Sequence, residues 1–222
     1  ELGLRPELLR AVDEAGYTTP TPIQVQAIPV ILAGKDVMGG AQTGTGKTAA
    51  FALPLLQRLV EGNKPATGPR KPRALILVPT RELAVQVADS VRSYGKHMRL
   101  NVTTIFGGAG MGPQVDNLRR GVDILVATPG RLIDHMERGR IDLSRLQMLV
   151  LDEADRMLDM GFMPDVERIC QALPAERQTL LFSATLDGNI GRIARDILKN
   201  PKTIQIAQQK EKHANIEQRL HF

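Results

Sequence analysis

The sequence predicts an α/β fold, in which helices cover both faces of a largely parallel sheet. Short runs rich in Val, Ile and Leu alternate along the chain with longer amphipathic segments, and parallel strands need such crossover helices between them. Hydrophobic residues make up 42% of the composition and charged residues 24%, as in ordinary globular proteins. The length of 222 residues suits one large domain.

The expected strands are seven short apolar runs, at residues 36–39, 73–78, 101–106, 122–127, 148–152, 179–183 and 203–206. Apolar residues at helical spacing place helices between them, at residues 47–60, 81–97, 113–120, 131–138 and 189–198. The aperiodic segment 61–73, with its Pro, Gly and basic residues, is predicted to be a mobile surface loop. Ligands of parallel sheets bind beyond the carboxyl ends of the strands, so the functional residues are expected in the loops there.

Composition excludes several classes of protein. The longest apolar runs, such as residues 148–151, are far shorter than the roughly 20 residues that span a bilayer, so no membrane association is expected. No secretory signal opens the sequence, and a cytoplasmic location is predicted. The single cysteine, Cys170, excludes an internal disulfide and is interpreted as a buried, inert thiol. A net charge of +5 favours polyanionic partners, while 3% aromatic residues argue against a base-stacking surface.

A glycine-rich segment joins the first expected strand to the helix that follows, which is the context of a phosphate-binding loop. Its residues are Ala41, Gln42, Thr43, Gly44, Thr45, Gly46, Lys47 and Thr48, with Ala41 where the strict pattern has glycine. Backbone N–H groups and the helix N-terminus would surround the phosphates of a nucleotide. Lys47 would reach the β and γ phosphates, and Thr48 a Mg²⁺ ion. The alternative is a glycine-rich turn that binds no nucleotide.

An acidic pair follows the buried apolar run that ends at residue 152. Asp152 would hold Mg²⁺ through its hydration shell, because Mg²⁺ keeps several waters and takes few carboxylates directly. Glu153 would orient or deprotonate an attacking water. The alternative, that these residues only cap the next helix, is weakened by the phosphate-binding loop about a hundred residues earlier.

Residues 152–155 spell Asp-Glu-Ala-Asp, and the chain resembles the first lobe of the DEAD-box RNA helicases over nearly its whole length. Further segments resemble family motifs in the family's order: the Q motif at 16–24, motif Ia at 79–84, paired glycines at 107–108, motif Ib at 128–131 and motif III at 183–185. Residues 156–162 resemble the bacterial RhlE-like branch. The resemblance implies a RecA-like P-loop NTPase domain over residues 1–207, with the Q motif within 1–26, and ATP and Mg²⁺ as cofactors.

The resemblance also assigns residues to the nucleotide site. Gln24 would read the adenine edge, with Tyr17 and Thr19 in the same subsite. Asp155, Ser183 and Thr185 would join the catalytic set, with hydrogen bonds from the last two to Asp155 that link ATP to RNA-dependent movement. A strand-to-helix turn with an N-cap is the alternative for Ser183 and Thr185.

An RNA-binding set is implied in the same way. It comprises Pro79, Thr80, Arg81, Gly107, Gly108, Thr128, Pro129, Gly130 and Arg131. Small residues, hydroxyls, helix N-termini and arginines suit a sugar-phosphate backbone, and such contacts carry no base code. Taken singly, each of these residues is equally compatible with a turn or a cap.

Members of this family close two lobes around ATP and RNA, so residues 208–222 are interpreted as a linker and the start of a second RecA-like domain. The isolated lobe is expected to be monomeric and to show little or no ATPase or unwinding activity. Two other function classes share parts of this pattern. Gln24 and Asp155 argue against a P-loop motor acting on DNA, and the intact Lys47, Asp152 and Glu153 argue against a non-catalytic adaptor that only clamps RNA or a partner.

Overall fold

The computed structural model of the protein describes residues 2–42, 44, 46–62 and 69–206. Among these residues, the strands are β1 (Val37–Gly40), β2 (Ala74–Leu77), β3 (Val102–Ile105), β4 (Ile124–Ala127), β5 (Met148–Asp152), β6 (Gln178–Ser183) and β7 (Lys202–Gln205). The helices are α1 (Pro6–Glu14), α2 (Pro22–Leu32), α3 (Lys47–Glu61), α4 (Arg81–Tyr94), α5 (Met111–Arg120), α6 (Pro129–Glu137), α7 (Ala154–Asp159), α8 (Met163–Ala172) and α9 (Asn189–Ile197).

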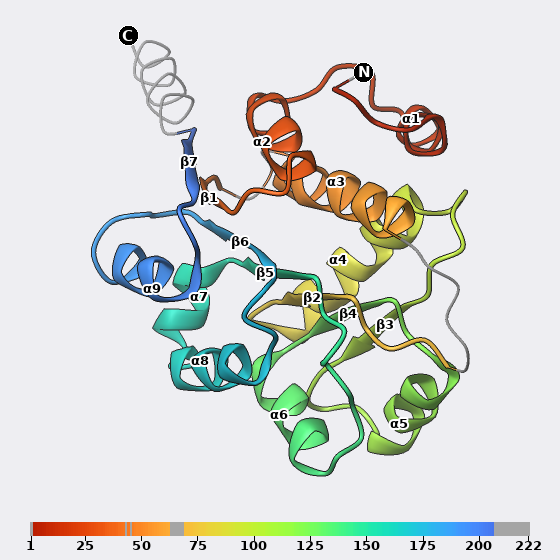
Figure 1. Cartoon of the computed structure of the whole chain (residues 1–222), viewed down its shortest axis with the longest axis vertical. Coiled ribbons are helices and arrows are strands. Elements are labelled where there is room, and N and C mark those ends of the chain that lie inside the picture. Colours follow the sequence, from red (N-terminus) through yellow and green to blue (C-terminus); the bar gives the residue numbers. More distant parts are fainter. Residues whose placement is uncertain (1, 43, 45, 63–68, 207–222) are drawn as a thin grey trace, which may run out of the picture.

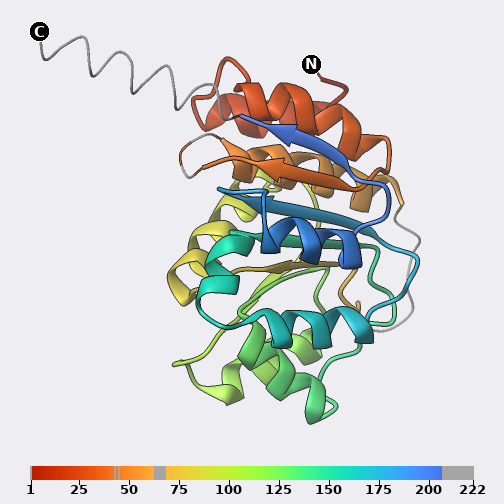
Figure 2. The ribbon, with the colours of Figure 1, turned by 90° about the vertical axis from the view of Figure 1, so that its left-hand side faces the viewer.

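The seven described strands form one sheet in the order β3-β4-β2-β5-β6-β1-β7, and every neighbouring pair is parallel. The prediction of a largely parallel α/β sheet is confirmed. Figure 2 shows the strands side by side and pointing the same way, with β7 next to β1 at the top of the view. All the loops that leave the carboxyl ends therefore meet along one edge.

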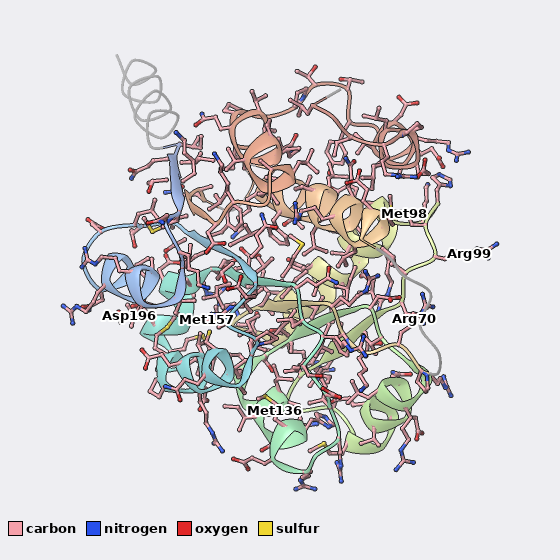
Figure 3. All side chains as sticks on the ribbon, in the orientation of Figure 1. Arg70, Met98, Arg99, Met136, Met157 and Asp196 are labelled. Atoms are coloured by element: carbon pink, nitrogen blue, oxygen red, sulfur yellow. The ribbon has the colours of Figure 1, made fainter. Side chains whose placement is uncertain are left out.

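Two hydrophobic cores lie on opposite faces of this sheet, because alternate residues of each strand point to opposite sides. In β5, Met148 and Val150 face the core formed with α2, α3 and α4, whereas Leu149 and Leu151 face the core formed with α6 to α9. Figure 1 shows α2 and α3 on one side of the sheet and α6, α8 and α9 on the other. Met157 of α7 lies within the second core (Figure 3).

Several element boundaries differ from those expected. The helix expected at 81–97 ends at Tyr94, and the helix expected at 131–138 begins two residues earlier, at Pro129, whose fixed backbone angle suits the first helical turn. Helices α1, α2, α7 and α8 lie outside the five helical ranges given above. Residues 63–68 of the predicted surface loop, and the predicted linker at 208–222, lie outside the described residues.

None of the described helices has the length and apolar composition that a membrane crossing requires. Cys170 is a buried free cysteine of α8, and burial raises the pKa of its thiol to about 11. The thiol therefore stays protonated at neutral pH, as the interpretation of an inert core residue requires.

A buried polar contact joins α5 to α6 beneath the loop that follows β3. The Gln114 amide donates to the Phe106 carbonyl at 3.0 Å, so its oxygen faces His135 Nε2 at 2.9 Å. Because that oxygen only accepts, Nε2 of His135 carries the proton and Nδ1 is left bare, with no partner among the described residues. Burial, and then the nearby Arg140 and Arg131, lower the pKa of His135.

We predict that acid weakens the fold through His135. The folded state holds this histidine neutral, whereas the unfolded chain binds a proton near the ordinary histidine pKa of about 6.5, so stability is retained above that pH and lost below it. His135→Gln keeps a donor toward Gln114 but does not titrate, and its stability should decline less between about pH 7 and pH 5. Urea midpoints measured across this range test the prediction, and parallel curves for the two proteins would contradict it.

Candidate functional site

The segment between β1 and α3 has the backbone of a phosphate-binding loop. Gly44 and Gly46 adopt left-handed conformations, with φ of 86° and 82°, which residues with side chains rarely adopt. Gly46 precedes α3 directly, and the Ala41 N–H donates to the Ser183 carbonyl at the end of β6. The free N–H groups of the first turn of α3 thus face the carboxyl edge of the sheet. Thr43 and Thr45 lie outside the described residues.

A buried ion-pair cluster joins this loop to the end of β5. Lys47 Nζ lies 2.9 Å from Asp152 Oδ1 and 3.4 Å from Glu153 Oε2, and the Asp152 side chain is only 1% exposed. Burial raises the pKa of the Asp152 carboxyl, while the adjacent ammonium of Lys47 opposes that shift. The cluster places one cation and two carboxylates where the sequence predicted the phosphates and the metal.

Glu153 has an unusual backbone. Its φ of 56° and ψ of 51° are left-handed, which costs a residue with a side chain roughly 1–2 kcal/mol. It occupies the position before α7, but its side chain makes no capping hydrogen bond. Instead the carboxylate turns toward Lys47 on one side and toward Arg156 NH1, at 3.2 Å, on the other. The interpretation of Glu153 as only a helix cap is therefore wrong.

Gln24 connects the segment before α2 to the phosphate-binding loop. Its side-chain oxygen accepts from the Thr21 N–H at 3.1 Å, and its Nε2 donates to the Gly46 carbonyl at 3.1 Å. A Cβ atom at Gly46 would lie 2.6 Å from that nitrogen, so only glycine permits this approach. An amide has two N–H groups and two lone pairs, and Gln24 keeps one of each for a ligand.

A cavity of about 370 Å³ brings the predicted nucleotide residues together. Those that line it are Tyr17, Thr19, Gln24, Gly44, Gly46, Lys47, Thr48, Asp152 and Glu153. Sequence reasoning missed Thr21 and the contribution of α4, from which Gln86, Ser90 and Tyr94 also line the cavity. A second cavity of about 280 Å³ shares Lys47 and Glu153 with the first, and its other lining residues are Ala41, Gln42, Asp155, Arg156 and Ala184.

The donor set at this site suits Mg²⁺. Thr48 and Asp152 offer one hydroxyl and one carboxylate, and no group of three or more His, Cys, Asp or Glu side chains that could hold a metal occurs in the described part of the chain. Beside nucleotides, Mg²⁺ usually takes only one or two oxygen ligands from the protein. Water and phosphate oxygens fill its remaining coordination positions.

Ser183 is buried at the end of β6, and its hydroxyl accepts from the Thr185 N–H at 3.4 Å. Helix α9 begins only at Asn189, with Gly188 before it, so neither Ser183 nor Thr185 is its N-cap. The capping alternative for this segment is wrong. The hydrogen bonds from these residues to Asp155 stay a prediction, since none joins the three described side chains in this structure.

The predicted RNA-binding residues follow β2, β3 and β4, which are neighbours in the sheet, so their loops are contiguous. The Thr80 hydroxyl caps α4 by accepting from the Leu83 N–H at 3.2 Å, whereas the Thr128 side chain, before α6, makes no capping bond. Pro79 and the first two residues of α6, Pro129 and Gly130, lie at the same edge. The set is thus brought together at the ends of three adjacent strands.

Two arginines of this set hold the loop after β3. Arg81 lies over the Phe106 ring, 5.2 Å from its centroid, and its NH1 is 3.5 Å from the Gly108 carbonyl. Arg131 NH1 donates to the Ala109 carbonyl at 2.9 Å. Gly107 and Gly108 have little side-chain bulk around them, and the φ of 82° at Gly108 favours glycine. Sequence reasoning missed Gln114, which supports the same loop, because nothing in its local pattern marks it.

Comparisons with known proteins agree with this geometry. Residues 21–193 match the family model described as DEAD/DEAH box helicase. The chain is 51% identical over 207 residues to the ATP-dependent RNA helicase DeaD of Escherichia coli K12, covering 93% of this chain and 32% of that protein. It is 45% identical to the DEAD-box ATP-dependent RNA helicase RhpA of Helicobacter pylori, covering 100% of this chain and 44% of that protein.

Solved structures give the same result for the fold. A DEAD box protein from Methanococcus jannaschii matches with a TM-score of 0.85 and 40% identity, over 92% of this chain and 55% of that chain. A hypothetical ATP-dependent RNA helicase from Sulfolobus tokodaii matches with a TM-score of 0.82 and 37% identity, over 91% and 57% of the two chains. The RecA-like fold is therefore confirmed, while the RhlE-like branch stays a prediction. With the family model matching most of its length, the chain belongs to the DEAD/DEAH box helicase family.

Proposed function

We propose that this chain is the ATP-binding and RNA-backbone-binding lobe of an ATP-dependent RNA helicase, which locally unwinds or remodels RNA. The observation that carries the proposal is the buried cluster of Lys47, Asp152 and Glu153 in the cavity beside Gln24. The chain spans about a third of the length of its E. coli relative, whose name states the helicase activity. A second RecA-like lobe, a cytoplasmic location and a monomeric lobe are parts of the same proposal.

The phosphates of ATP would enter between the loop and the carboxylates. Lys47 is the first residue of α3, beside the phosphate-binding loop. Its ammonium can therefore leave the carboxylates and pair with the β and γ phosphates, which carry more charge. Thr48 and Asp152 would hold Mg²⁺, which supplies positive charge against the phosphate oxygens. The adenine would lie against Tyr17 and Thr19, with the remaining donor and acceptor of Gln24 on its edge.

Hydrolysis needs a group that accepts a proton from water. Glu153 is a buried residue whose carboxylate lies next to Lys47, so it would lie beside the γ phosphate once Lys47 has moved there. It would orient the water and take its proton during attack. Asp155, Ser183 and Thr185 would couple this step to RNA, since Ser183 ends the strand next to β5.

RNA would lie across the loops after β2, β3 and β4. Helix N-termini at Thr80 and Thr128 offer backbone N–H groups to phosphates, and Arg81 and Arg131 add guanidinium groups. Both arginines contact carbonyls of the loop after β3, so RNA must share or replace these contacts. Because β2 is the neighbour of β5, this surface adjoins the buried cluster of Lys47, Asp152 and Glu153.

We predict that Lys47→Ala strongly weakens nucleotide binding. A hydrogen bond between charged groups contributes about 1.5–3 kcal/mol, or roughly 10- to 100-fold in affinity, and the variant deletes the cation that faces the phosphates. Titration with a fluorescent ATP analogue measures the effect, and urea unfolding shows whether the fold persists. Lys199→Ala, which removes a surface lysine paired weakly with Glu176, is the matched control. Unchanged affinity in folded Lys47→Ala would overturn the assignment of the phosphate site.

The 222-residue chain alone is predicted to bind adenine nucleotide but to hydrolyse ATP barely and to leave an RNA duplex intact. An arginine supplied from outside a P-loop site accelerates phosphoryl transfer by about 10³- to 10⁵-fold, and no arginine of the described chain lines the larger nucleotide cavity. Phosphate release with and without RNA, compared between this chain and the complete protein, tests the prediction. RNA-stimulated turnover by the chain alone at the rate of the complete protein would refute the two-lobe proposal.

A further inference from the structure

The two oxygens of the Glu153 carboxylate are held by two different cations. Oε2 lies 3.4 Å from Lys47 Nζ, at the start of α3, and Oε1 lies 3.2 Å from Arg156 NH1, in α7. The left-handed backbone at Glu153 turns its side chain between them. Arg156 also lines the cavity of about 280 Å³, together with Lys47 and Glu153.

These two cations differ in what else they contact. Lys47 is buried and lies closer to Asp152, at 2.9 Å, than to Glu153, and phosphates would draw it away from both carboxylates. Arg156 is three residues after Glu153, and its side chain is 50% exposed. Its link to Glu153 is internal to one short segment, so it does not depend on where Lys47 lies.

We infer that Arg156 is a positioning residue for ATP hydrolysis: it holds Glu153 Oε1, so that Oε2, when Lys47 leaves it for the phosphates, is the oxygen that faces the attacking water. The inference rests on the proposed function and deepens it. In the step concerned, the water oxygen bonds to the γ phosphorus and its proton passes to Glu153 Oε2. The bond from that phosphorus to the β–γ bridging oxygen breaks, and ADP leaves with the electron pair.

Stability alone does not account for this contact. Ion pairs with an exposed member, three residues apart, contribute only about 0.3–0.5 kcal/mol. The orientation of the Glu153 carboxylate would matter more, because a small misplacement of a catalytic group lowers the reaction rate by up to about 100-fold. Asp155 lines the same cavity, but among the described residues the ion pair that Arg156 forms is with Glu153.

The chain offers a matched control. Arg168 in α8 pairs with Glu137 at 2.6 Å, and both side chains are more than half exposed on the surface, away from either cavity. Arg168→Gln therefore removes an arginine–glutamate pair of similar chemistry without touching the site. Arg156→Gln removes the cation beside Glu153, and Arg156→Lys keeps a positive charge there but loses the planar guanidinium.

The test is steady-state phosphate release by the complete protein, with saturating RNA and varied ATP. We expect Arg156→Gln to lower kcat by between about 10- and 100-fold, with the KM for ATP changed less than about twofold, and Arg156→Lys to recover part of the loss. Arg168→Gln should match the wild type. As a second readout, the affinity of the 222-residue chain for a fluorescent ATP analogue should not change in Arg156→Gln.

Several results would overturn the inference: wild-type kcat in Arg156→Gln, a raised KM with kcat unchanged, an equal loss in Arg168→Gln, or an Arg156→Lys variant no better than Arg156→Gln. Urea midpoints for all variants separate a lost function from a lost fold. If the wild-type chain binds no nucleotide, or the wild-type protein does not hydrolyse ATP, the proposed function itself fails. That outcome is distinct from a failure confined to Arg156.

Discussion

The buried pair between Lys47 and Asp152 is the interaction on which the site depends. Lys47 starts α3 and Asp152 ends β5, two strands away from the strand that leads into α3. Taking two charges out of water costs several kcal/mol per ion, and their mutual attraction repays this only in good geometry. A pair of this kind is weak support for stability, but it keeps a cation and a carboxylate poised where a charged ligand can exchange with them.

The backbone around this pair is left-handed at three positions. Gly44 and Gly46 take left-handed conformations to bring the loop beside β5, and Glu153 takes one without being glycine. Strain in a residue of this kind persists only where its surroundings hold it, and here Lys47 and Arg156 hold its carboxylate on both sides. Gln24 adds a third link, from the segment before α2 to Gly46. The adenine, phosphate and metal subsites that we propose are thus connected through a few short contacts.

The sheet and the main site could be predicted from the sequence because their signals are local. Each strand is a short apolar run, and the glycine loop and the acidic pair each follow such a run directly, so the parallel topology alone brings them to one edge. The helix N-termini were less accurate, since Pro129 and Met111 extend helices that periodicity began later. Element boundaries depend on caps and prolines that apolar spacing does not report.

Side-chain partners were harder to predict, because they depend on how distant elements pack. The contact between Gln114 and His135 joins two helices through residues that are 21 positions apart in the sequence, and neither residue has a marked local pattern. Thr80 is engaged as a helix cap and Thr128 is not, a difference that two similar turns do not reveal in sequence. Arg156 is the exception, because it follows Glu153 by only three residues, so this pair is local in sequence even though Glu153 lies before α7 and not on the helix.

The most direct test of the proposed ATP site is a crystal structure of this chain with Mg²⁺ and a non-hydrolysable ATP analogue. We expect the phosphates to lie in the loop between Gly44 and Thr48, and Lys47 Nζ to have moved from Asp152 to the β and γ phosphates. We expect Asp152 to face the metal through water, and the adenine to lie against Gln24. Phosphates bound elsewhere, or a Lys47 that keeps its 2.9 Å contact with Asp152 while nucleotide is bound, would contradict the proposed site.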